Sequence, residues 1–174
     1  MIRVQWHLER SARLSPDGVY RYQLSRVWDR DSLCQVWAML NPSTADSEVD
    51  DPTIRRCMGF SKRAGYGGIT VLNLYALRAT NPRELLSHPD PEGPENVSAW
   101  REVFEQMDFP TAIAAWGVTP KLSPSKALAL SWPIRLGCLG VTKNGHPRHP
   151  LYVRGEQPFM PWVQVLAPTR GGDA

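Results

Sequence analysis

The sequence has few cysteines, and their spacing excludes the common cysteine-ligated metal centres. Its three cysteines, Cys34, Cys57 and Cys138, lie far apart among 174 residues and form no Cys-x-x-Cys pair. Zinc and iron-sulfur sites need more cysteine or histidine ligands at shorter spacings, and a disulfide framework needs denser cysteines. The pattern therefore favours reduced thiols, and we expect neither a metal ion nor a cofactor.

Long apolar runs and blocks of like charge are absent as well. No apolar run reaches the roughly 18 residues of a membrane-spanning helix, and residues 1–7 show no secretory signal. Lys and Arg number 20 against 17 Asp and Glu, which gives a net charge of +3. Because no basic block is present, this charge permits contact with nucleic acid without requiring it. We expect a cytoplasmic protein that does not associate with membranes, and its oligomeric state is left open.

The residues that are present predict a single domain. With 42% hydrophobic residues, a chain of 174 residues can bury one substantial core. We expect residues 1–174 to form one domain, with a core over about 19–153 and a frayed tail over 163–174. Alternating large apolar and polar residues over 19–28 precede an apolar run over 33–40. A turn between these two segments predicts an antiparallel hairpin.

The rest of the chain alternates between strand and helix patterns. Apolar runs over 69–75, 111–116 and 134–141 predict further strands. Helices are expected over 52–64, about 94–107 and about 124–131, and Asp51-Pro52 and Gly65 are typical of the two ends of the helix over 52–64. The expected fold is a three-layer α/β/α sandwich, with a mainly parallel sheet of about four core strands plus the N-terminal hairpin. In such a sheet the carboxyl ends of the strands share one edge, where ligands bind.

Two asparagines lie at or near these strand ends. Asn41 opens the loop after the strand over 33–40, where it can serve as a turn residue or contact a ligand. Asn73 interrupts an apolar strand, so its carboxamide needs partners, either in a buried polar network or on the edge of a bound base. Asp46, Asp50 and Asp51 can act as metal ligands, but helix caps and a solvated acidic loop are the better interpretation.

The segment 142–152 gathers cations and two histidines in a proline-stiffened loop. Lys143, His146, Arg148 and His149 all lie there. The spacing of the two histidines provides half of a metal site, but no complementary pair follows. Anion binding, or stabilisation of developing negative charge, suits these side chains better, and a purely structural loop is the alternative.

Aromatic residues near the strand ends have a structural interpretation beside the functional one. Trp116, which precedes Gly117, is expected to pack in the core, and Tyr75 can stack on a base or pack against the sheet. Arg78 lies in the polar loop that follows the strand over 69–75.

Several short motifs together closely resemble a bacterial and phage family of unknown function. The resemblance covers most of the chain, from about residue 20 to 152. The motifs are Met39-Leu-Asn-Pro-Ser-Thr-Ala-Asp46, Asp50-Asp-Pro-Thr-Ile-Arg-Arg56, Asn73-Leu-Tyr-Ala-Leu-Arg-Ala-Thr80, Ala115-Trp-Gly117 and Gly145-His-Pro-Arg-His-Pro150.

In order and spacing, four segments also resemble the uracil-DNA glycosylase superfamily. Its members have a Gly-x-Asn-Pro or Gly-x-Asp-Pro loop, a strand ending in Asn, an apolar strand ending in Gly, and a His-Pro loop. The corresponding segments here are Met39-Leu-Asn-Pro42, Val71-Leu-Asn73, Ile113-Ala-Ala-Trp-Gly117 and His146-Pro147. Met39 stands where glycine is usual, so the resemblance does not assign uracil as the base.

The resemblance implies a uracil-DNA glycosylase-like fold and a DNA glycosylase that hydrolyses the N-glycosidic bond of a damaged or modified base. It makes Asn41 the group that positions water, His146 the group that stabilises the departing base, and Asn73 a reader of the base edge. A carboxamide cannot accept a proton, so Asn41 is no general base. The other expected substrate-binding residues are Pro42, Ser43, Tyr75, Arg78, Trp116, Gly117, Lys143, Arg148 and His149.

Two other functions stay open. Asn41 in place of a carboxylate, and Met39 in place of glycine, also fit a non-catalytic module that binds nucleic acid or a nucleotide. A hydrolase of free nucleosides or nucleotides is the third reading. Release of a base from DNA separates these functions.

Overall fold

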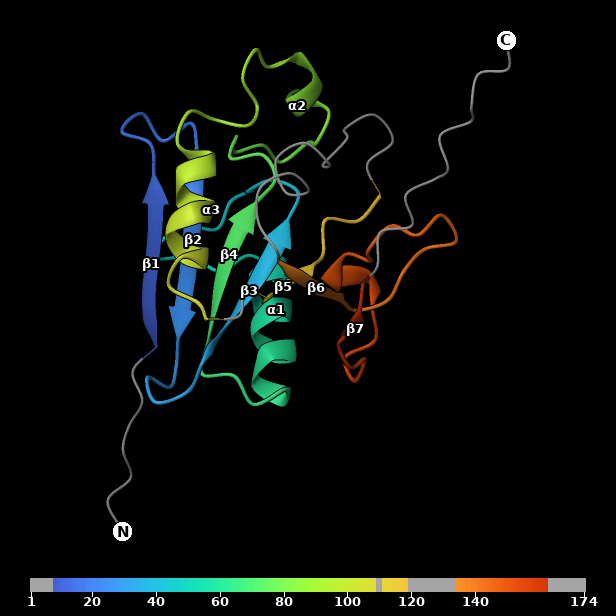
Figure 1. Ribbon diagram of the computed structural model, residues 1–174. Coiled ribbons are helices and arrows are strands. Elements are labelled where there is room, and N and C mark those ends of the chain that lie inside the picture. Colours follow the sequence, from blue (N-terminus) through green and yellow to red (C-terminus); the bar gives the residue numbers. More distant parts are fainter. Residues whose placement is uncertain (1–7, 109–110, 119–133, 163–174) are drawn as a thin grey trace.

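A computed structural model of the chain describes residues 8–108, 111–118 and 134–162. Its strands form one sheet of seven strands in the order β1-β2-β4-β3-β5-β6-β7 (Figure 1). The strands are β1 (Glu9–Leu14), β2 (Arg21–Val27), β3 (Cys34–Met39), β4 (Gly68–Asn73), β5 (Thr111–Ala114), β6 (Arg135–Cys138) and β7 (Met160–Pro161). The helices of this part of the chain are α1 (Pro52–Arg63), α2 (Glu84–Ser87), α3 (Asn96–Phe104) and the short 3-10 helix η1 (Pro150–Tyr152).

The sheet is mixed. Neighbours in the central run β4-β3-β5-β6 are parallel, and β1, β2 and β7 are added in antiparallel pairing at the two sides. The predicted α/β class is therefore confirmed, whereas the sheet is larger than expected because it also contains β1 and β7. Both lie at the edges of the sheet, and neither carries a strong apolar pattern, since β1 has no buried residue and β7 has only two residues.

The predicted hairpin between β2 and β3 is wrong, because β4 lies between these two strands. The start of β4 fits there because Gly67 has no side chain. Its carbonyl accepts hydrogen bonds from the N–H groups of Trp28 (2.8 Å) and Asp29 (2.9 Å), and its own N–H donates to the carbonyl of Leu33 (2.9 Å). A Cβ at this position would lie 2.2 Å from the carbonyl oxygen of Asp29. Local pattern predicts both strands, but it cannot show a third strand inserted between them.

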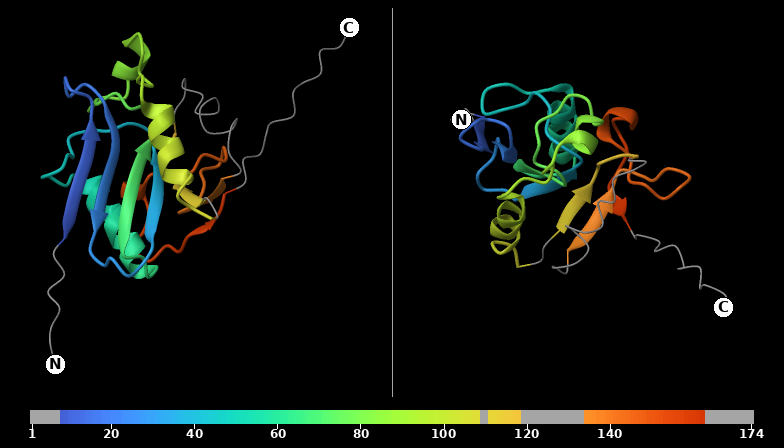
Figure 2. Two further views of the ribbon diagram at one scale, coloured as in Figure 1. Left: turned by 60° about the vertical axis from the view of Figure 1, so that its left-hand side comes forward. Right: turned by 90° about the horizontal axis from the view of Figure 1, so that it is seen from above.

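Helices cover both faces of the sheet (Figure 2). α1 packs on one face and α3 on the other, because alternate strand residues point to opposite sides. The α1 side includes Leu24, Trp37, Ile54, Cys57, Phe60, Ile69 and Val71. The α3 side includes Val36, Ala38, Leu72, Leu74, Trp100, Phe104 and Trp116.

The predicted start of α1 is confirmed. The Asp51 carboxylate accepts a hydrogen bond from the N–H of Ile54 (2.8 Å), Pro52 occupies the first turn, and Gly65 follows the helix with φ +85°. The expected helix over 94–107 is present as the shorter α3. The expected helix over 124–131 and the tail over 163–174 lie outside the described residues. No helix within the described ranges is long and apolar enough to cross a membrane.

Candidate functional site

A cavity of about 400 Å³ lies where β3 and β5 end, beside the N-terminus of α1. It is on the α1 side of the sheet, since Met39, Ile54 and Val71 of that core form part of its wall. The structure brings part of the predicted set together here. The sequence candidates that line the cavity are Asn41, Ser43, Trp116, Gly117 and His149. Sequence reasoning did not propose three further lining residues, Arg21, Asp51 and Tyr152, as parts of the site.

Asn41 is fixed by its amide nitrogen. Its Nδ2 donates to the carbonyl oxygens of Ala79 (2.7 Å) and Pro42 (3.0 Å), which ties the loop after β3 to the loop after β4. Its Oδ1 has no hydrogen-bond partner within the described part of the chain. Asn41 is thus both a turn residue and a fixed acceptor beside the cavity.

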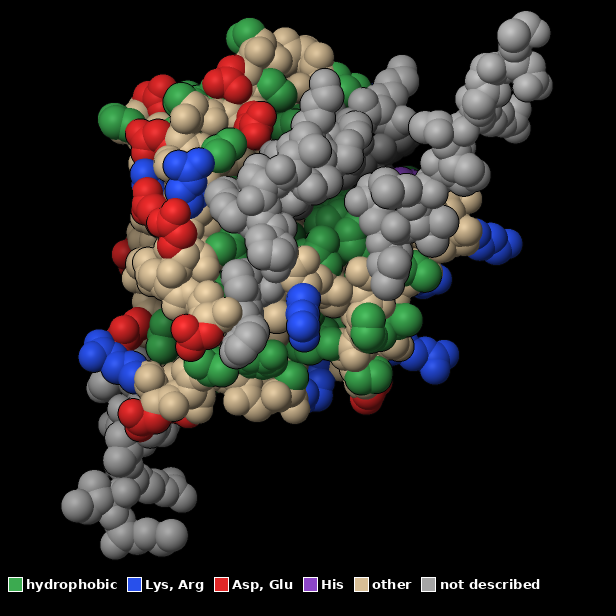
Figure 3. All heavy atoms as spheres, viewed as in Figure 1, with side chains coloured by type: hydrophobic (Ala, Val, Ile, Leu, Met, Phe, Trp, Pro, Cys, Tyr) green, Lys and Arg blue, Asp and Glu red, His purple; other side chains and the backbone are tan. Residues whose placement is uncertain are grey.

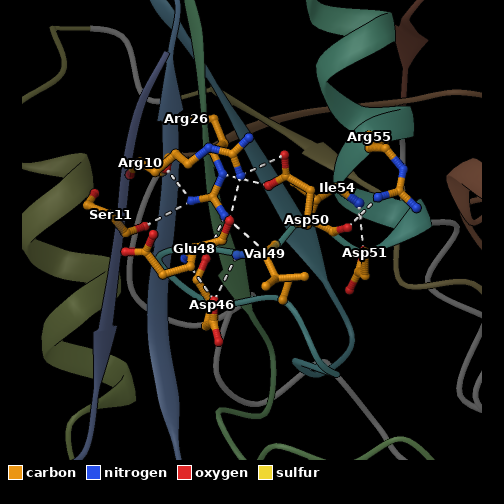
Figure 4. Close-up of polar contacts among 12 residues, drawn as sticks. Arg10, Ser11, Arg26, Asp46, Glu48, Val49, Asp50, Asp51, Ile54 and Arg55 are labelled. Atoms are coloured by element: carbon orange, nitrogen blue, oxygen red, sulfur yellow. Dashed lines mark hydrogen bonds and ion pairs between the residues drawn. The ribbon is translucent and has the colours of Figure 1, made fainter. Parts of the chain in front are cut away.

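Asp51 reaches the cavity because Arg26, in strand β2 of the sheet, holds the loop before α1 in place. Buried Arg26 in β2 pairs with Asp50 at 2.7 Å and also donates to the carbonyl of Asp46 (Figure 4). The Asp46 carboxylate accepts the N–H groups of Glu48 (2.8 Å) and Val49 (2.9 Å), so it closes the loop on itself. Two of the three acidic residues are therefore occupied in holding the loop, and the third caps α1 at the cavity wall.

His149 also lines the cavity, and it lies at the start of η1. Its Nδ1 accepts the N–H of Leu151 at 3.3 Å, so the proton of the neutral ring is on Nε2. Burial lowers the pKa of the imidazole, and the nearby Asp51 carboxylate opposes part of that effect. The ring is therefore neutral at neutral pH and carries a donor that the backbone does not use.

A β-bulge in β2 places the side chain of Arg21 at the cavity. Arg13 opposes Gln23 and Leu14 opposes Arg21, so Tyr22 is an extra residue in the pairing with β1. Leu24 packs on the α1 side, while Tyr22 packs near Ala99 of α3. Because of this extra residue, Arg21 lies on the same side of the sheet as Leu24, the α1 side, where it lines the cavity. Strict alternation places Arg21 on the opposite face from Leu24, which explains why the sequence pattern gave no signal for it.

Asn73 lies below the cavity and does not line it. It is 1% exposed, and its Oδ1 accepts a hydrogen bond from Nη2 of Arg21 at 3.2 Å. Its backbone carbonyl accepts from the side chains of Asn96 and Trp100, both at 3.0 Å. The carboxamide belongs to a polar network whose member at the cavity is Arg21.

One family model matches the chain over residues 21–151, and its description is Protein of unknown function (DUF1643). The chain belongs to this family. The range matched by the DUF1643 family includes Arg21, Asn41, Asp51, Trp116 and His149, and Tyr152 follows directly after it. No curated protein and no solved structure matches the chain.

The remaining candidates in this member of the DUF1643 family lie around the cavity. Pro42 is buried and its carbonyl accepts the N–H of Ala79 (2.9 Å), while Tyr75 packs against the α3-side core. Arg78 lines a neighbouring hollow of about 310 Å³, of which Ser43 is also part. His146 lies outside the cavity lining, and its N–H donates to the Thr142 hydroxyl at 3.2 Å. Lys143 and Arg148 are exposed on the same loop and do not line the cavity.

Acidic side chains are unevenly spread over the face of the molecule drawn in Figure 3. On the face shown in Figure 3, most acidic side chains lie on the side that carries α3, whereas Lys and Arg occur both there and on the side that carries β6 and β7. Residues 134–162 contain Arg135, Lys143, Arg148 and Arg154 but only one acidic residue, Glu156. Among the described residues, no cluster of three or more His, Cys, Asp or Glu side chains is arranged to hold a metal ion.

Proposed function

We propose that this protein hydrolyses the N-glycosidic bond of a damaged or modified base in DNA. The observation that carries the proposal is the convergence of the Asp51 carboxylate, the His149 imidazole and the Asn41 carboxamide on one cavity of about 400 Å³. A cavity of this size suits a base that has been rotated out of the duplex. Trp116 packs mainly in the α3-side core and contributes apolar surface to the cavity lining where β5 ends.

The chemistry follows from the charges of these groups. Asp51 accepts a proton from a water molecule while the water oxygen bonds to the anomeric carbon of the sugar. The N-glycosidic bond breaks, and its electron pair stays on the base nitrogen. The Nε2–H of His149 hydrogen-bonds the negative charge that develops on the base. The base then takes up the proton, and the sugar keeps the new hydroxyl.

This assignment differs from the one that the superfamily resemblance implies. The base-stabilising role passes from His146 to His149, because only the latter lines the cavity. Asp51 supplies the proton acceptor that a carboxamide cannot be. Asn41 keeps the role of orienting water, through the Oδ1 that the loop leaves free.

Surface charge supports DNA as the partner. Lys143 and Arg148 are exposed on the loop that leads to His149, and both are suited to contact phosphates. Tyr152 at the rim is 79% exposed, so its ring is available to stack on a neighbouring base.

Base release from oligonucleotides tests the proposal. Duplex and single-stranded substrates that carry uracil, hypoxanthine or a hypermodified pyrimidine are incubated with the protein, and abasic sites are cleaved and counted. We expect abasic product from at least one modified base and none from unmodified DNA. Absence of product from the whole panel contradicts the proposal.

A non-catalytic binding module is the second candidate. One observation favours it: one oxygen of Asp51 already caps α1, which draws the carboxylate toward the helix. In that case the cavity holds a base or nucleotide without cutting it. Tight, salt-dependent binding of DNA with no base release supports the module, and measurable release rules it out.

A further inference from the structure

The cavity contains a buried guanidinium with unused hydrogen-bonding capacity. Arg21 is 2% exposed, although it forms part of the lining. Nη1 donates to the carbonyl of Ala45 at 2.7 Å, and Nη2 donates to Oδ1 of Asn73 at 3.2 Å. Nε of Arg21 and Nδ2 of Asn73 are buried donors with no partner in the described ranges. Two adjacent donors therefore lack an acceptor.

The charge of Arg21 also lacks a direct counter-ion. It forms no ion pair with any carboxylate of residues 8–108, 111–118 or 134–162. Asp51 and Asp46 attract it only from a distance, and Arg78 and Arg26 repel it. Burial lowers the pKa of the guanidinium to about 10, so the group stays charged at neutral pH.

Arg26 in the same strand provides an internal comparison. It is equally buried, but it pairs with Asp50 at 2.7 Å and does not line the cavity. A buried charge is costly unless a partner of opposite charge accompanies it. Of these two arginines, the one without a carboxylate partner is the one at the cavity, where a ligand can supply the missing negative charge.

We propose that Arg21 binds an anionic group of the ligand, a carboxylate or a phosphate, and that Asn73 is the residue that positions it. The planar guanidinium matches the geometry of either group. The anionic group is inferred from Arg21 alone. That the remainder of the ligand is a base or its nucleotide rests on the proposed function. It narrows the substrate class to bases with an acidic substituent, or to nucleotides whose phosphate enters this cavity.

Two matched pairs of ligands test the inference on the unaltered protein. One pair is uracil-5-carboxylate and uracil-5-carboxamide, and the other is uridine 5′-monophosphate and uridine. Binding is followed at constant ionic strength through tryptophan fluorescence, since Trp116 lines the cavity. We expect the anionic member of one pair to bind at least about tenfold more tightly than its neutral partner. A preference in the first pair identifies a substituent on the base, and a preference in the second identifies a phosphate. Equal affinities within both pairs overturn the inference.

Substitutions then assign the preference to one side chain. Arg21→Met is expected to abolish it, whereas Arg55→Met, which removes an exposed cation of α1, leaves it unchanged. A preference that survives in folded Arg21→Met overturns the inference. If that variant does not fold, the comparison of ligand pairs on the unaltered protein decides alone.

This inference and the proposed function fail separately. Anion preference without base release leaves the Arg21 site standing and removes the hydrolase. Base release without anion preference supports the hydrolase and rules out the Arg21 site.

Discussion

Leu151 donates its backbone N–H to Nδ1 of His149 across 3.3 Å, and this contact leaves Nε2 as the nitrogen that carries the proton in the neutral ring. Protonation of Nδ1 breaks the contact, because a protonated nitrogen cannot accept. The contact and the burial of the ring both favour the neutral form.

The first prediction is that the free energy of unfolding depends on pH because His149 changes its protonation state. Its folded-state pKa lies below the unfolded value of about 6.5, so the unfolded chain binds more protons below that pH. The stabilising contribution is complete above pH 6.5 and is lost as the pH falls toward the folded-state pKa. Urea unfolding of the parent and of His149→Gln between pH 5 and 8 isolates it. A difference in free energy that does not change with pH contradicts this prediction.

The second prediction separates the two roles of Asp51. Asparagine caps helices about as well as aspartate, so Asp51→Asn is expected to change the free energy of unfolding by no more than about 1 kcal/mol. Asp51→Ala loses the hydrogen bond to the N–H of Ile54 and is expected to cost about 1 kcal/mol more. Urea denaturation measures both. Equal stability of the two variants argues against a structural role for the cap.

The third prediction concerns the insertion of β4 between β2 and β3. Gly67→Ala places a methyl group 2.2 Å from the carbonyl oxygen of Asp29, and we expect a loss of about 2–3 kcal/mol. Gly59→Ala in α1 is the control, since its new methyl meets only the end of Arg63 at 3.9 Å. The control is expected to gain about 0.5–1 kcal/mol through helix propensity. Thermal unfolding ranks the variants, and a neutral Gly67→Ala refutes the close approach.

The fourth prediction addresses the basic loop. If Lys143 and Arg148 contact phosphates, each substitution to Gln lowers DNA affinity and reduces the slope of log K against log salt by about 1. Arg30→Gln, in the turn between β2 and β3 at the opposite edge of the parallel strands, is the control and leaves the slope unchanged. Fluorescence anisotropy at several salt concentrations provides the slopes. Unchanged slopes for both loop variants place the DNA elsewhere on the surface.

Much of the secondary structure is predictable because its signals are local. The strand over 69–75 and the cap at Asp51 each depend on neighbouring residues, and both appear close to their expected positions. Strand order is a different matter. The insertion of β4 depends on contacts between Gly67 and a turn more than thirty residues earlier in the chain, which no local pattern encodes.

The candidate site was only partly predictable for the same reason. His146 and His149 have the same side chain and lie in one proline-rich loop, so the sequence does not distinguish them. Tertiary contacts determine which of the two lines the cavity. The hydrogen bond from the N–H of Gly117 to the carbonyl of Pro147 (3.1 Å) holds the loop so that His149 lies against Gly117. Arg21 depends on the bulge at Tyr22, which reverses the alternation that the sequence displays.

Base release by Asp51→Asn tests the central claim most directly. The variant is compared with the parent under single-turnover conditions on the modified oligonucleotide from which the parent releases the base fastest. Asparagine preserves the helix cap but cannot accept the proton, so we predict a rate at least about 100-fold lower with an unchanged melting temperature within a few degrees. A rate equal to that of the parent contradicts the assignment of Asp51 as the proton acceptor and, with it, the proposed mechanism.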